Sequence, residues 1–417
     1  MPQLRKGSRD LIREINHNLV LNLIKSRGPI SRTEIAQLSG LSPATISGIT
    51  ADLMASSLVQ ETGEGEATRG RRRVLLQLNP RAGFVVGIKL MEQAVASALT
   101  DLDAQVLHYR VTPLRGAGGP LGAAPADLEA VLATIVQVVE QTIAESGVAR
   151  AEVLGVGVGM AGLIDGEAGV CHYSPYFGWR NVRLGERLAD RLDLPVYLEN
   201  DVNTLTVAEQ WFGYGHGRDH FAVVTVGRGV GAGIVVNGQF YRGALGGAGE
   251  LGHLTLQADG PLCACGKRGC LESLASDPAV LRAARAAMAA GAPTALSEPL
   301  TLEAIVAAAE AGDDLARGVL ADAGRWLGIG IAALVNLLNP QLLIVGGEGV
   351  RAGAWRLDPM RRAIAEHAYT GLEEGLEIIV EPSGDEAWAR GAACVVLGEL
   401  FKPPVHKRPE AEGAPSQ

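Results

Sequence analysis

Cysteine is scarce in this sequence, which has 417 residues and five cysteines: Cys171, Cys263, Cys265, Cys270 and Cys394. So few cysteines in so long a chain do not form a disulfide framework, which excludes the class of small disulfide-stabilised secreted proteins. The first residues, "MPQLRKGSRD", also lack the apolar segment of a signal peptide. We therefore expect the protein to reside in reducing cytoplasm.

A hydrophobic run long enough to span a membrane is missing as well. The longest apolar stretch, "LGIGIAALVNLLNPQLLIVGG", is interrupted by Asn336, Asn339 and Pro340. This pattern predicts a buried helix, a turn and a core strand. The hydrophobic content of 47% and the charged content of 20% are typical of a globular protein. The length is too great for one core and predicts two or three domains.

Charge is unevenly distributed along the chain. Residues 1–80 contain eleven Lys or Arg and seven Asp or Glu, a balance of +4. The whole chain carries −9, so residues 81–417 carry −13. A basic N-terminal segment followed by an acidic remainder indicates a module that binds a polyanion, attached to a body with another role.

Three helices are predicted within the first 55 residues. The segment "IREINHNLVLNLIKSRG" has apolar residues at helical spacing and ends before the Gly-Pro pair at 28–29. Ser31 and Glu34 have the spacing of a capping box, which begins a second helix. Ser42 followed by Pro43 begins a third helix. The tight turn "SGLS" joins the last two, which is typical of a helix-turn-helix.

A basic loop follows the third helix. In "LVQETGEGEATRGRRRVLLQLN", two apolar strand-like runs flank a segment rich in glycine and arginine, as in the wing of a winged helix. The alternative is a small helical domain with a solvated basic hairpin, but the order of caps, turn and basic loop favours DNA binding. The residues expected to contact a groove or phosphates are Ala44, Thr45 and Ser47 in the third helix and Arg69, Arg71, Arg72 and Arg73 in the loop.

The composition changes at Gly83, where an α/β pattern begins. Apolar strand-like runs alternate with Ala-rich helical segments from there to about residue 400. Several of the strands are followed by glycine-rich or polar segments, among them "GMAGLID" and "LENDVN". The polar, Pro-containing segment 403–417 is expected to be a disordered tail.

Six motifs of this body resemble, in the same order, those of the ROK family of bacterial sugar kinases and sugar-responsive repressors: "GMAGLID", "LENDVN", "VTVGRGVGAGI", "GGAGELGH", "CACGKRGCLE" and "LLIVGGEGV". The resemblance implies a two-lobed ribonuclease-H-like body of the actin and hexokinase type. We expect a first lobe at 83–199, completed by a helix near 385–402, and a second lobe at 200–384. The repressor branch, which includes xylose and N-acetylglucosamine repressors, also has an N-terminal winged helix, as interpreted here for residues 1–80.

The candidate metal ligands are His253, Cys263, Cys265 and Cys270. Three of the five cysteines fall within eight residues, which makes chance cysteines in a loop a poor alternative. One imidazole and three thiolates suit tetrahedral zinc, and the resemblance implies a structural zinc site here. Four protein ligands leave no open coordination position, so we assign the ion no hydrolytic role.

The resemblance also implies sugar contacts. Carboxylates and amides can each hold two adjacent hydroxyls, and the family positions that do so fall on five residues here. These residues are Asn200, Asp201, Glu250, His253 and Glu272. The sequence departs from the family where "PNLGW"-like stretches place an Asn, because it reads "SPYFGW" and has Tyr176 there. We expect a phenol in place of an amide either to change the preferred sugar or to add stacking.

One of the two phosphate loops of ROK kinases is altered. The first, "DIGGTK"-like, reads "KLMEQA", so Lys89 replaces the aspartate and Met91, Glu92 and Gln93 replace Gly-Gly-Thr. Side chains then occupy the place where backbone N–H groups would hold a phosphate. The second loop, "TVGRGVGAG", is retained, and Asp201 matches the kinase base. We therefore expect no enzyme activity, with Asp201 acting as a ligand acceptor.

The sequence thus predicts a sugar-responsive transcriptional regulator, a repressor of carbohydrate-use genes that a monosaccharide releases or modulates. Its expected partners are double-stranded operator DNA, a monosaccharide effector and further copies of itself in a homodimer or homotetramer, with structural Zn²⁺ as cofactor and no membrane. Two alternatives stay open. One is a sugar kinase with a DNA-binding head, and the other is a DNA-binding protein whose body only oligomerises.

Overall fold

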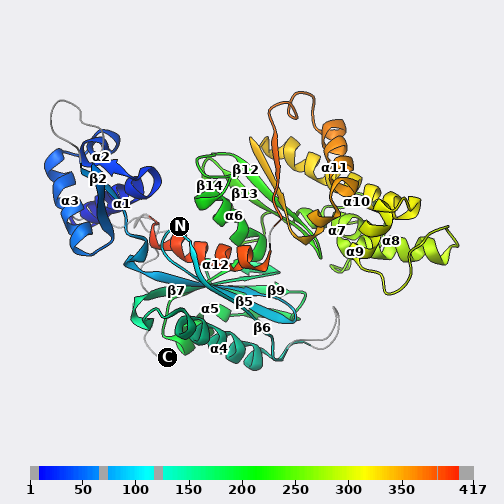
Figure 1. The fold of residues 1–417 in the computed structure, drawn as a ribbon, viewed down its shortest axis with the longest axis horizontal. Coiled ribbons are helices and arrows are strands. Elements are labelled where there is room, and N and C mark those ends of the chain that lie inside the picture. Colours follow the sequence, from blue (N-terminus) through cyan, green and yellow to red (C-terminus); the bar gives the residue numbers. More distant parts are fainter. Residues whose placement is uncertain (1–8, 65–73, 117–124, 383, 403–417) are drawn as a thin grey trace.

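The structure is a computed structural model that describes residues 9–64, 74–116, 125–382 and 384–402. A small N-terminal unit lies beside two larger α/β lobes, each of which is built on a five-stranded sheet (Figure 1). The mixed α/β fold expected from the sequence is confirmed, and each lobe has its own hydrophobic core.

The N-terminal unit combines three helices with a three-stranded antiparallel sheet of order β1-β3-β2. The predicted capping box is present, because the Ser31 side chain accepts from the Glu34 amide while the Glu34 carboxylate accepts from the Ser31 amide. The predicted cap at Ser42, with Pro43 in the first helical turn, is present too. The elements are α1 (Arg9–Arg27), β1 (Ile30–Ser31), α2 (Arg32–Ser39), α3 (Pro43–Ala55), β2 (Val59–Glu64) and β3 (Val74–Leu78).

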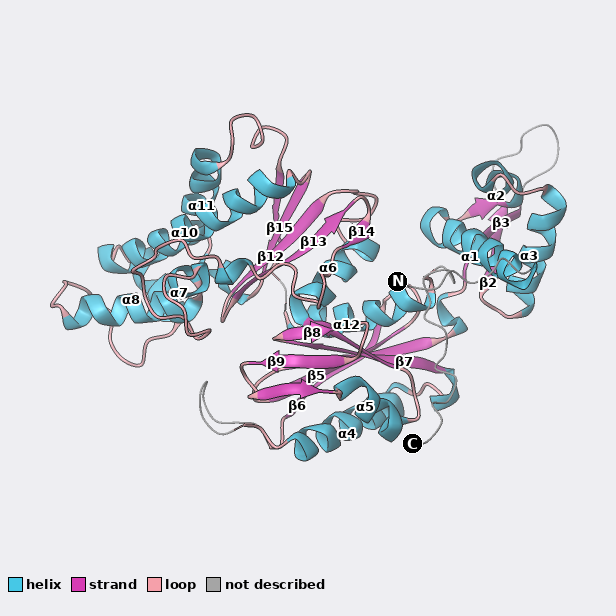
Figure 2. Ribbon diagram, turned by 180° about the vertical axis from the view of Figure 1, so that it is seen from behind, coloured by secondary structure: helices cyan, strands magenta, loops and turns pink. Residues whose placement is uncertain are grey.

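The first lobe has a sheet of order β11-β7-β4-β5-β6, in which β4, β5 and β6 are antiparallel while β7 and β11 run parallel to β4. Helices α4 and α5 cover one face and α12 crosses the other (Figures 1 and 2). The strands are β4 (Phe84–Leu90), β5 (Ala94–Thr100), β6 (Val106–Pro113), β7 (Val153–Met160) and β11 (Val196–Asn200). The helices are η1 (Pro80–Ala82), α4 (Leu128–Ser146), η2 (Arg150–Glu152), α5 (Leu184–Leu192) and α12 (Asp385–Leu400).

A small antiparallel sheet of order β10-β9-β8 extends this lobe beyond β7. Its strands are β8 (Leu163–Asp165), β9 (Val170–Ser174) and β10 (Trp179–Val182). Trp179 stacks on Phe177, and its indole nitrogen donates to the carbonyl of Ala126 at 3.1 Å. These contacts attach the segment that carries Tyr176 to the core of the lobe.

The second lobe repeats the topology of the first. Its sheet has the order β14-β13-β12-β15-β16, again with an antiparallel hairpin on one side and parallel strands on the other. The strands are β12 (Phe221–Val226), β13 (Val230–Val236), β14 (Gln239–Phe240), β15 (Leu342–Gly346) and β16 (Glu377–Val380). The helices are α6 (Asp201–Phe212), η3 (Leu251–His253), α7 (Leu271–Ala275), α8 (Asp277–Ala289), α9 (Leu302–Glu310), α10 (Asp314–Leu338), η4 (Glu348–Ala352) and α11 (Ala354–His367).

The long apolar stretch of the sequence forms α10 and β15. Within the described part of the chain, α10 is the one helix that is long and apolar enough to cross a membrane by length and composition. More than half of its most apolar window is buried inside the protein, and Leu327 and Ile331 belong to the core of the second lobe. The predicted buried helix, turn and core strand are therefore confirmed.

Helix α12 brings the end of the chain back onto the first sheet, where it packs across β4, β5 and β7. Two glycines allow this close approach. A Cβ atom at Gly87 would lie 1.9 Å from the carbonyl oxygen of Ala389, and one at Gly157 would lie 1.9 Å from that of Ala392. Because both obstacles are backbone atoms, the spacing between sheet and helix depends on the absence of side chains at these two positions.

Candidate functional site

The four candidate metal ligands meet in the loop between β14 and α7. Their ligand atoms all lie within 4.8 Å of one another. Nδ1 of His253 is 3.7 Å from Sγ of Cys263, and the Sγ atoms of Cys265 and Cys270 are 3.7 Å apart. Ligands bound to one tetrahedral zinc ion at about 2.0–2.3 Å are separated by roughly 3.3–3.8 Å. The donor set and its spacing therefore fit such an ion.

The backbone of this loop closes tightly on itself. Gly269 has a φ of 66°, and a Cβ atom there would lie 1.5 Å from the carbonyl oxygen of Gln257. A β-bridge between Leu262 and Arg268 closes the segment that carries the first two cysteines. The loop can bring its thiols together only because residue 269 has no side chain.

His253 presents its two ring nitrogens to different neighbours. Nδ1 faces Cys263, whereas Nε2 lies 3.8 Å from Oε2 of Glu250. One imidazole nitrogen can bind a metal while the other forms a hydrogen bond, which orients the ring. The two roles expected for His253, metal ligand and sugar contact, are therefore compatible with one ring position.

Glu272, in the first turn of α7, joins the cysteine loop to the second lobe's hairpin. Its Oε2 accepts from the backbone N–H of Val230 at 3.2 Å, and its Oε1 lies 3.9 Å from Sγ of Cys263. A Cβ atom at Gly229 would lie 2.8 Å from the same Oε2. The glycine-rich turn before β13 thus leaves space for this carboxylate.

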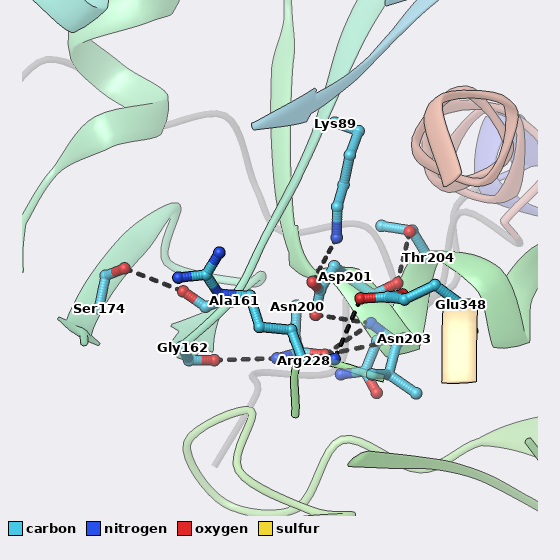
Figure 3. A network of polar contacts seen from close by, with 11 residues as sticks. Lys89, Ala161, Gly162, Ser174, Asn200, Asp201, Asn203, Thr204, Arg228 and Glu348 are labelled. Carbon is cyan, nitrogen blue, oxygen red and sulfur yellow. Dashed lines mark hydrogen bonds and ion pairs between the residues drawn. The ribbon is translucent and has the colours of Figure 1, made fainter. Parts of the chain in front are cut away.

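Asn200 and Asp201 lie where β11 ends and α6 begins, as Figure 3 shows. The Asn200 side chain caps α6 by accepting from the Val202 amide at 2.9 Å, and it donates to the carbonyl of Gly162 at 3.0 Å. The ammonium group of Lys89, at the end of β4, forms a short ion pair with Asp201. Both partners are largely buried, so Lys89 holds a positive charge directly on the carboxylate that matches the kinase base.

Arg228 connects the two lobes beside Asn200 and Asp201 (Figure 3). Its guanidinium group forms an ion pair with Glu92 at 2.5 Å, and its backbone N–H donates to Glu348 at 3.0 Å. The same guanidinium lies 5.4 Å from the ring centroid of Tyr176. The altered first loop and the retained second loop are therefore joined through Glu92 and Arg228.

The carboxylates at the site influence one another. The Glu250 side chain is about half exposed; partial burial raises its pKa, and the charges of Glu272 and Asp201 raise it further, against the opposing effect of His253. Burial also raises the pKa of Tyr176, with added contributions from Asp201 and Glu272. These electrostatic effects act over short distances. They therefore place five residues in one group: Asp201, Glu250, His253, Glu272 and Tyr176. At neutral pH Tyr176 stays a neutral phenol, which can donate a hydrogen bond.

The residues expected to contact DNA fall into two sets. Ala44, Thr45 and Ser47 lie exposed at the N-terminal end of α3, with the Ser47 hydroxyl donating to the carbonyl of Pro43 at 2.9 Å. The second set, Arg69, Arg71, Arg72 and Arg73, lies outside the described residues.

Sequence reasoning missed Arg228 and Glu348. Arg228 stands between two glycines in "VGRGVG", and that exposed position in a phosphate-loop motif was a usable signal. Glu348 follows Gly347 after β15, and no spacing in the sequence indicates that it reaches the turn at Arg228. The pairing of Lys89 with Asp201 spans 112 positions and likewise depends on the fold.

Comparisons with known proteins agree with this geometry. Residues 85–399 match the sequence profile described as "ROK family". The xylose repressor of Caldicellulosiruptor bescii is 31% identical over 403 residues, which cover 95% of this chain and 99% of the relative. The DNA-binding transcriptional dual regulator NagC of Escherichia coli is 31% identical over 378 residues, which cover 90% of this chain and 91% of the relative.

Two solved structures are instructive together. A ROK family transcriptional regulator, a homolog of the E. coli MLC protein, is 31% identical with a TM-score of 0.82, covering 95% of this chain and 98% of its own. A ROK family glucokinase from Streptomyces griseus, in complex with glucose and AMPPNP, is 29% identical with a TM-score of 0.64, covering 75% of this chain and 99% of its own. With the family profile matched over most of its length and relatives 31% identical along nearly all of it, the chain belongs to the ROK family.

Proposed function

We propose that this ROK chain is a sugar-responsive transcriptional repressor. The observation that carries the proposal is the joining, in one chain, of a unit with an exposed helix α3 to a body with clustered carboxylates beside a Cys3His loop. The similar transcriptional regulator covers 95% of the chain, whereas the similar glucokinase covers 75%. The part of the chain that the glucokinase does not cover favours a regulator over a kinase. The location proposed for this regulator is the cytoplasm.

DNA recognition is assigned to the N-terminal unit. The exposed start of α3 presents Ala44, Thr45 and Ser47, whose small and hydroxyl side chains suit base edges in a major groove. The basic residues in the loop between β2 and β3, Arg69, Arg71, Arg72 and Arg73, are assigned to phosphates or a minor groove. Two such units in a homodimer or homotetramer would bind two half-sites of one operator.

Sugar recognition is assigned to the carboxylate group. Asp201, Glu250 and Glu272 supply acceptors for sugar hydroxyls. Because Nδ1 of His253 faces Cys263, the other ring nitrogen, Nε2, is the one assigned to sugar contact. The Asn200 amide already bonds Gly162 and the start of α6, so its contact with a sugar would add to a structural role. Tyr176 closes the same group and would select among sugars by shape and by its hydroxyl.

The metal assigned to the Cys3His set is zinc. His253, Cys263, Cys265 and Cys270 would hold it, and zinc would supply a structural cross-link, because four protein ligands fill a tetrahedral ion. This cross-link would fix the loop between Glu250 and Glu272. The chain's own residues would then perform the recognition, with Glu272 held by the Val230 amide and His253 held by the ion.

Phosphoryl transfer is not part of the proposed function. Glu92 and Met91 put side chains where a kinase needs free backbone N–H groups, and Glu92 is paired with Arg228. Lys89 forms an ion pair with Asp201, so the carboxylate that a kinase would present to a sugar hydroxyl already has a partner. The remaining alternatives are a kinase with a DNA-binding head and a body that only oligomerises.

The test has two arms. A duplex selected by the purified chain from a random-sequence library is labelled, and its affinity is measured by fluorescence anisotropy without sugar and with xylose, N-acetylglucosamine or glucose. The proposal expects one sugar to raise the melting temperature of the protein and to change operator affinity at least about fivefold. Operator binding with no response to any sugar in a wide panel would favour the body that only oligomerises, and sugar binding without DNA binding would refute the regulator.

A further inference from the structure

Lys25 of α1 places its ammonium group among aromatic rings of the body. Its Nζ lies 3.2 Å from the centroid of the Trp211 ring and 3.9 Å from that of Phe401, with Phe212 at 5.6 Å. We call this set of three rings the Lys25 cage. Asn22, one turn earlier in α1, donates to the carbonyl of Phe401 at 3.0 Å. These contacts attach the N-terminal unit to the body next to the end of α12 (Figure 1).

Burying the Lys25 ammonium group in this cage is energetically unfavourable, because the group loses its hydration. Burial lowers the pKa of Lys25 to about 7, although the negative charge of Asp103 acts in the opposite direction. Within the described residues, Nζ has no hydrogen-bond acceptor. The attraction of a ring face for a cation offsets only part of the loss of hydration. Such a contact is well suited to exist in one state and to break in another.

Helix α6 connects the Lys25 cage with the candidate ligand site. Its first residue is Asp201, which pairs with Lys89 at the ligand site, and its last residues include Trp211 and Phe212 of the cage. The twelve residues span about 18 Å at about 1.5 Å per residue. Each residue from Val202 to Glu209 is buried, which leaves the helix able to move only as a rigid body against its neighbours.

We propose that helix α6 couples the sugar site to the DNA-binding unit, with Lys25 in its aromatic cage as the contact that the coupling makes and breaks. The inference rests on the proposed function and specifies how it is regulated. A sugar hydroxyl that bonds Asp201 competes with Lys89 for the same carboxylate. The altered contact shifts the start of α6 relative to β4, and the rigid helix carries that shift to Trp211 and Phe212.

The two states differ in what they do to the N-terminal unit. With Lys25 in the cage, α1 is fixed to the body, and the distance between the two α3 helices of an oligomer is set by the body. With Lys25 released to water, α1 is free to reorient. A ligand shifts this equilibrium only through its different affinity for the two states, which is why contact with Asp201 at one end of α6 is required.

The decisive variant is Lys25→Met in the full-length chain. Methionine fills the cage without a charge, so the N-terminal unit stays attached and the fold is retained. We expect wild-type operator affinity to change by about 5- to 150-fold with the sugar that binds, the usual range of such couplings. We expect the variant to bind the same operator and the same sugar but to show a change of less than about threefold.

Two matched variants define the controls. Lys402→Met removes a lysine from the same end of α12, where it pairs with Glu399 and lies outside the cage, and should leave the coupling unchanged. Lys25→Arg keeps a cation that stacks on aromatic rings and should restore most of the coupling. Hydrogen exchange of α1 provides a readout without DNA, because added sugar should raise exchange in the wild type and leave it unchanged in Lys25→Met.

The outcomes separate the two proposals. If no sugar changes the wild-type operator affinity, the proposed function fails and the inference fails with it. If sugar acts on the wild type and acts equally on Lys25→Met, the function stands and the role of Lys25 is refuted. If Lys25→Met loses sugar binding itself, measured by calorimetry with the same sugar, the cage is structural and the coupling role is again refuted.

Discussion

The two lobes have the same topology, but their first hairpin turns differ in chemistry. In the first lobe, the turn between β4 and β5 contains Met91, Glu92 and Gln93. In the second lobe, the turn between β12 and β13 is Gly227, Arg228 and Gly229. The sheets that hold these turns have equivalent strand orders. The fold thus fixes where the turns lie, while their side chains decide what can bind between them.

Glycine in the second turn makes room for carboxylates. A Cβ atom at Gly227 would lie 2.4 Å from the Glu348 carboxyl carbon, and one at Gly229 would lie 2.8 Å from Oε2 of Glu272. The first turn uses its side chains in the opposite way, because Glu92 reaches out to Arg228. The second turn therefore leaves room for Glu272, one of the residues proposed to bind sugar, whereas the first turn is filled by its own side chains.

The largest effect is expected from removing a cysteine behind the second turn. Cys265→Ser should lose the metal, and a structural metal contributes several kcal/mol to folding. The loop that positions Glu272 would then loosen, so sugar binding should be lost while the first lobe stays folded. Metal content is measured by mass spectrometry of the purified chain and sugar binding by calorimetry.

Cys171→Ser is the matched control, because Cys171 is buried in the first lobe and takes no part in the metal set. It should keep about one zinc ion per chain and normal sugar binding. A Cys265→Ser protein with no metal and unchanged sugar affinity would contradict the role given to the loop.

A second effect compares glycines of the two lobes. Gly157→Ala puts a Cβ atom against the Ala392 carbonyl oxygen at 1.9 Å, so α12 must move and unfolding should become easier by about 3 kcal/mol. Gly229→Ala meets only the flexible end of Glu272, so it should cost little stability but weaken sugar binding. Gly318→Ala, with nothing within 4 Å in an exposed part of α10, should stabilise by about 0.5–1 kcal/mol.

Denaturant unfolding of the three variants, combined with sugar titration, measures both quantities. The comparison fails if Gly229→Ala unfolds as easily as Gly157→Ala, because the second turn would then be part of the structural core. It also fails if Gly229→Ala binds sugar with wild-type affinity, because Glu272 would then tolerate displacement.

A smaller effect is expected where the two turns meet. Arg228 is more than half exposed, so a double-mutant cycle of Glu92→Gln and Arg228→Gln should give a coupling of only about 0.5 kcal/mol. Burial raises the pKa of Glu92 above its ordinary 4.5, against the effect of Arg228. The folded protein then binds more protons than the unfolded chain just above pH 4.5, so stability falls as pH rises through that window.

Glu92→Gln should flatten that part of the stability profile, measured by thermal melts between pH 4 and 7. Glu310→Gln, at the exposed C-terminal end of α9, serves as the control. A steeper profile in Glu92→Gln would mean that the ion pair with Arg228 outweighs burial.

Local patterns and long-range pairs were not equally readable from the sequence. Caps at Ser31 and Ser42 and the Cys3His set follow from residue types at short spacing, and the structure confirms the caps and gathers the four ligands. The metal set could be predicted because His253 and Cys270 are only seventeen positions apart. The contacts of Arg228 with Glu92 and Glu348 join residues more than a hundred positions apart, and the Lys25 cage joins residues near both ends of the chain.

The smallest expected effect is the absence of one. Sugar-dependent ADP release with Mg-ATP should stay at background across hexoses, pentoses and amino sugars, because phosphoryl transfer depends mainly on positioning and charge neutralisation around the phosphates. The first turn offers Glu92, which repels phosphate, and Lys89 occupies Asp201. Replacing the three residues of the first turn by glycines alone should not create activity, since Lys89 would still pair with Asp201. Adding Lys89→Asp removes that pair and restores the carboxylate that the resemblance to ROK kinases implies at this position. If only this quadruple variant shows turnover, the difference between regulator and kinase lies in these four residues. Turnover by the wild type on the order of 1 per second or faster would instead show that the side chains of the first turn do not prevent phosphoryl transfer.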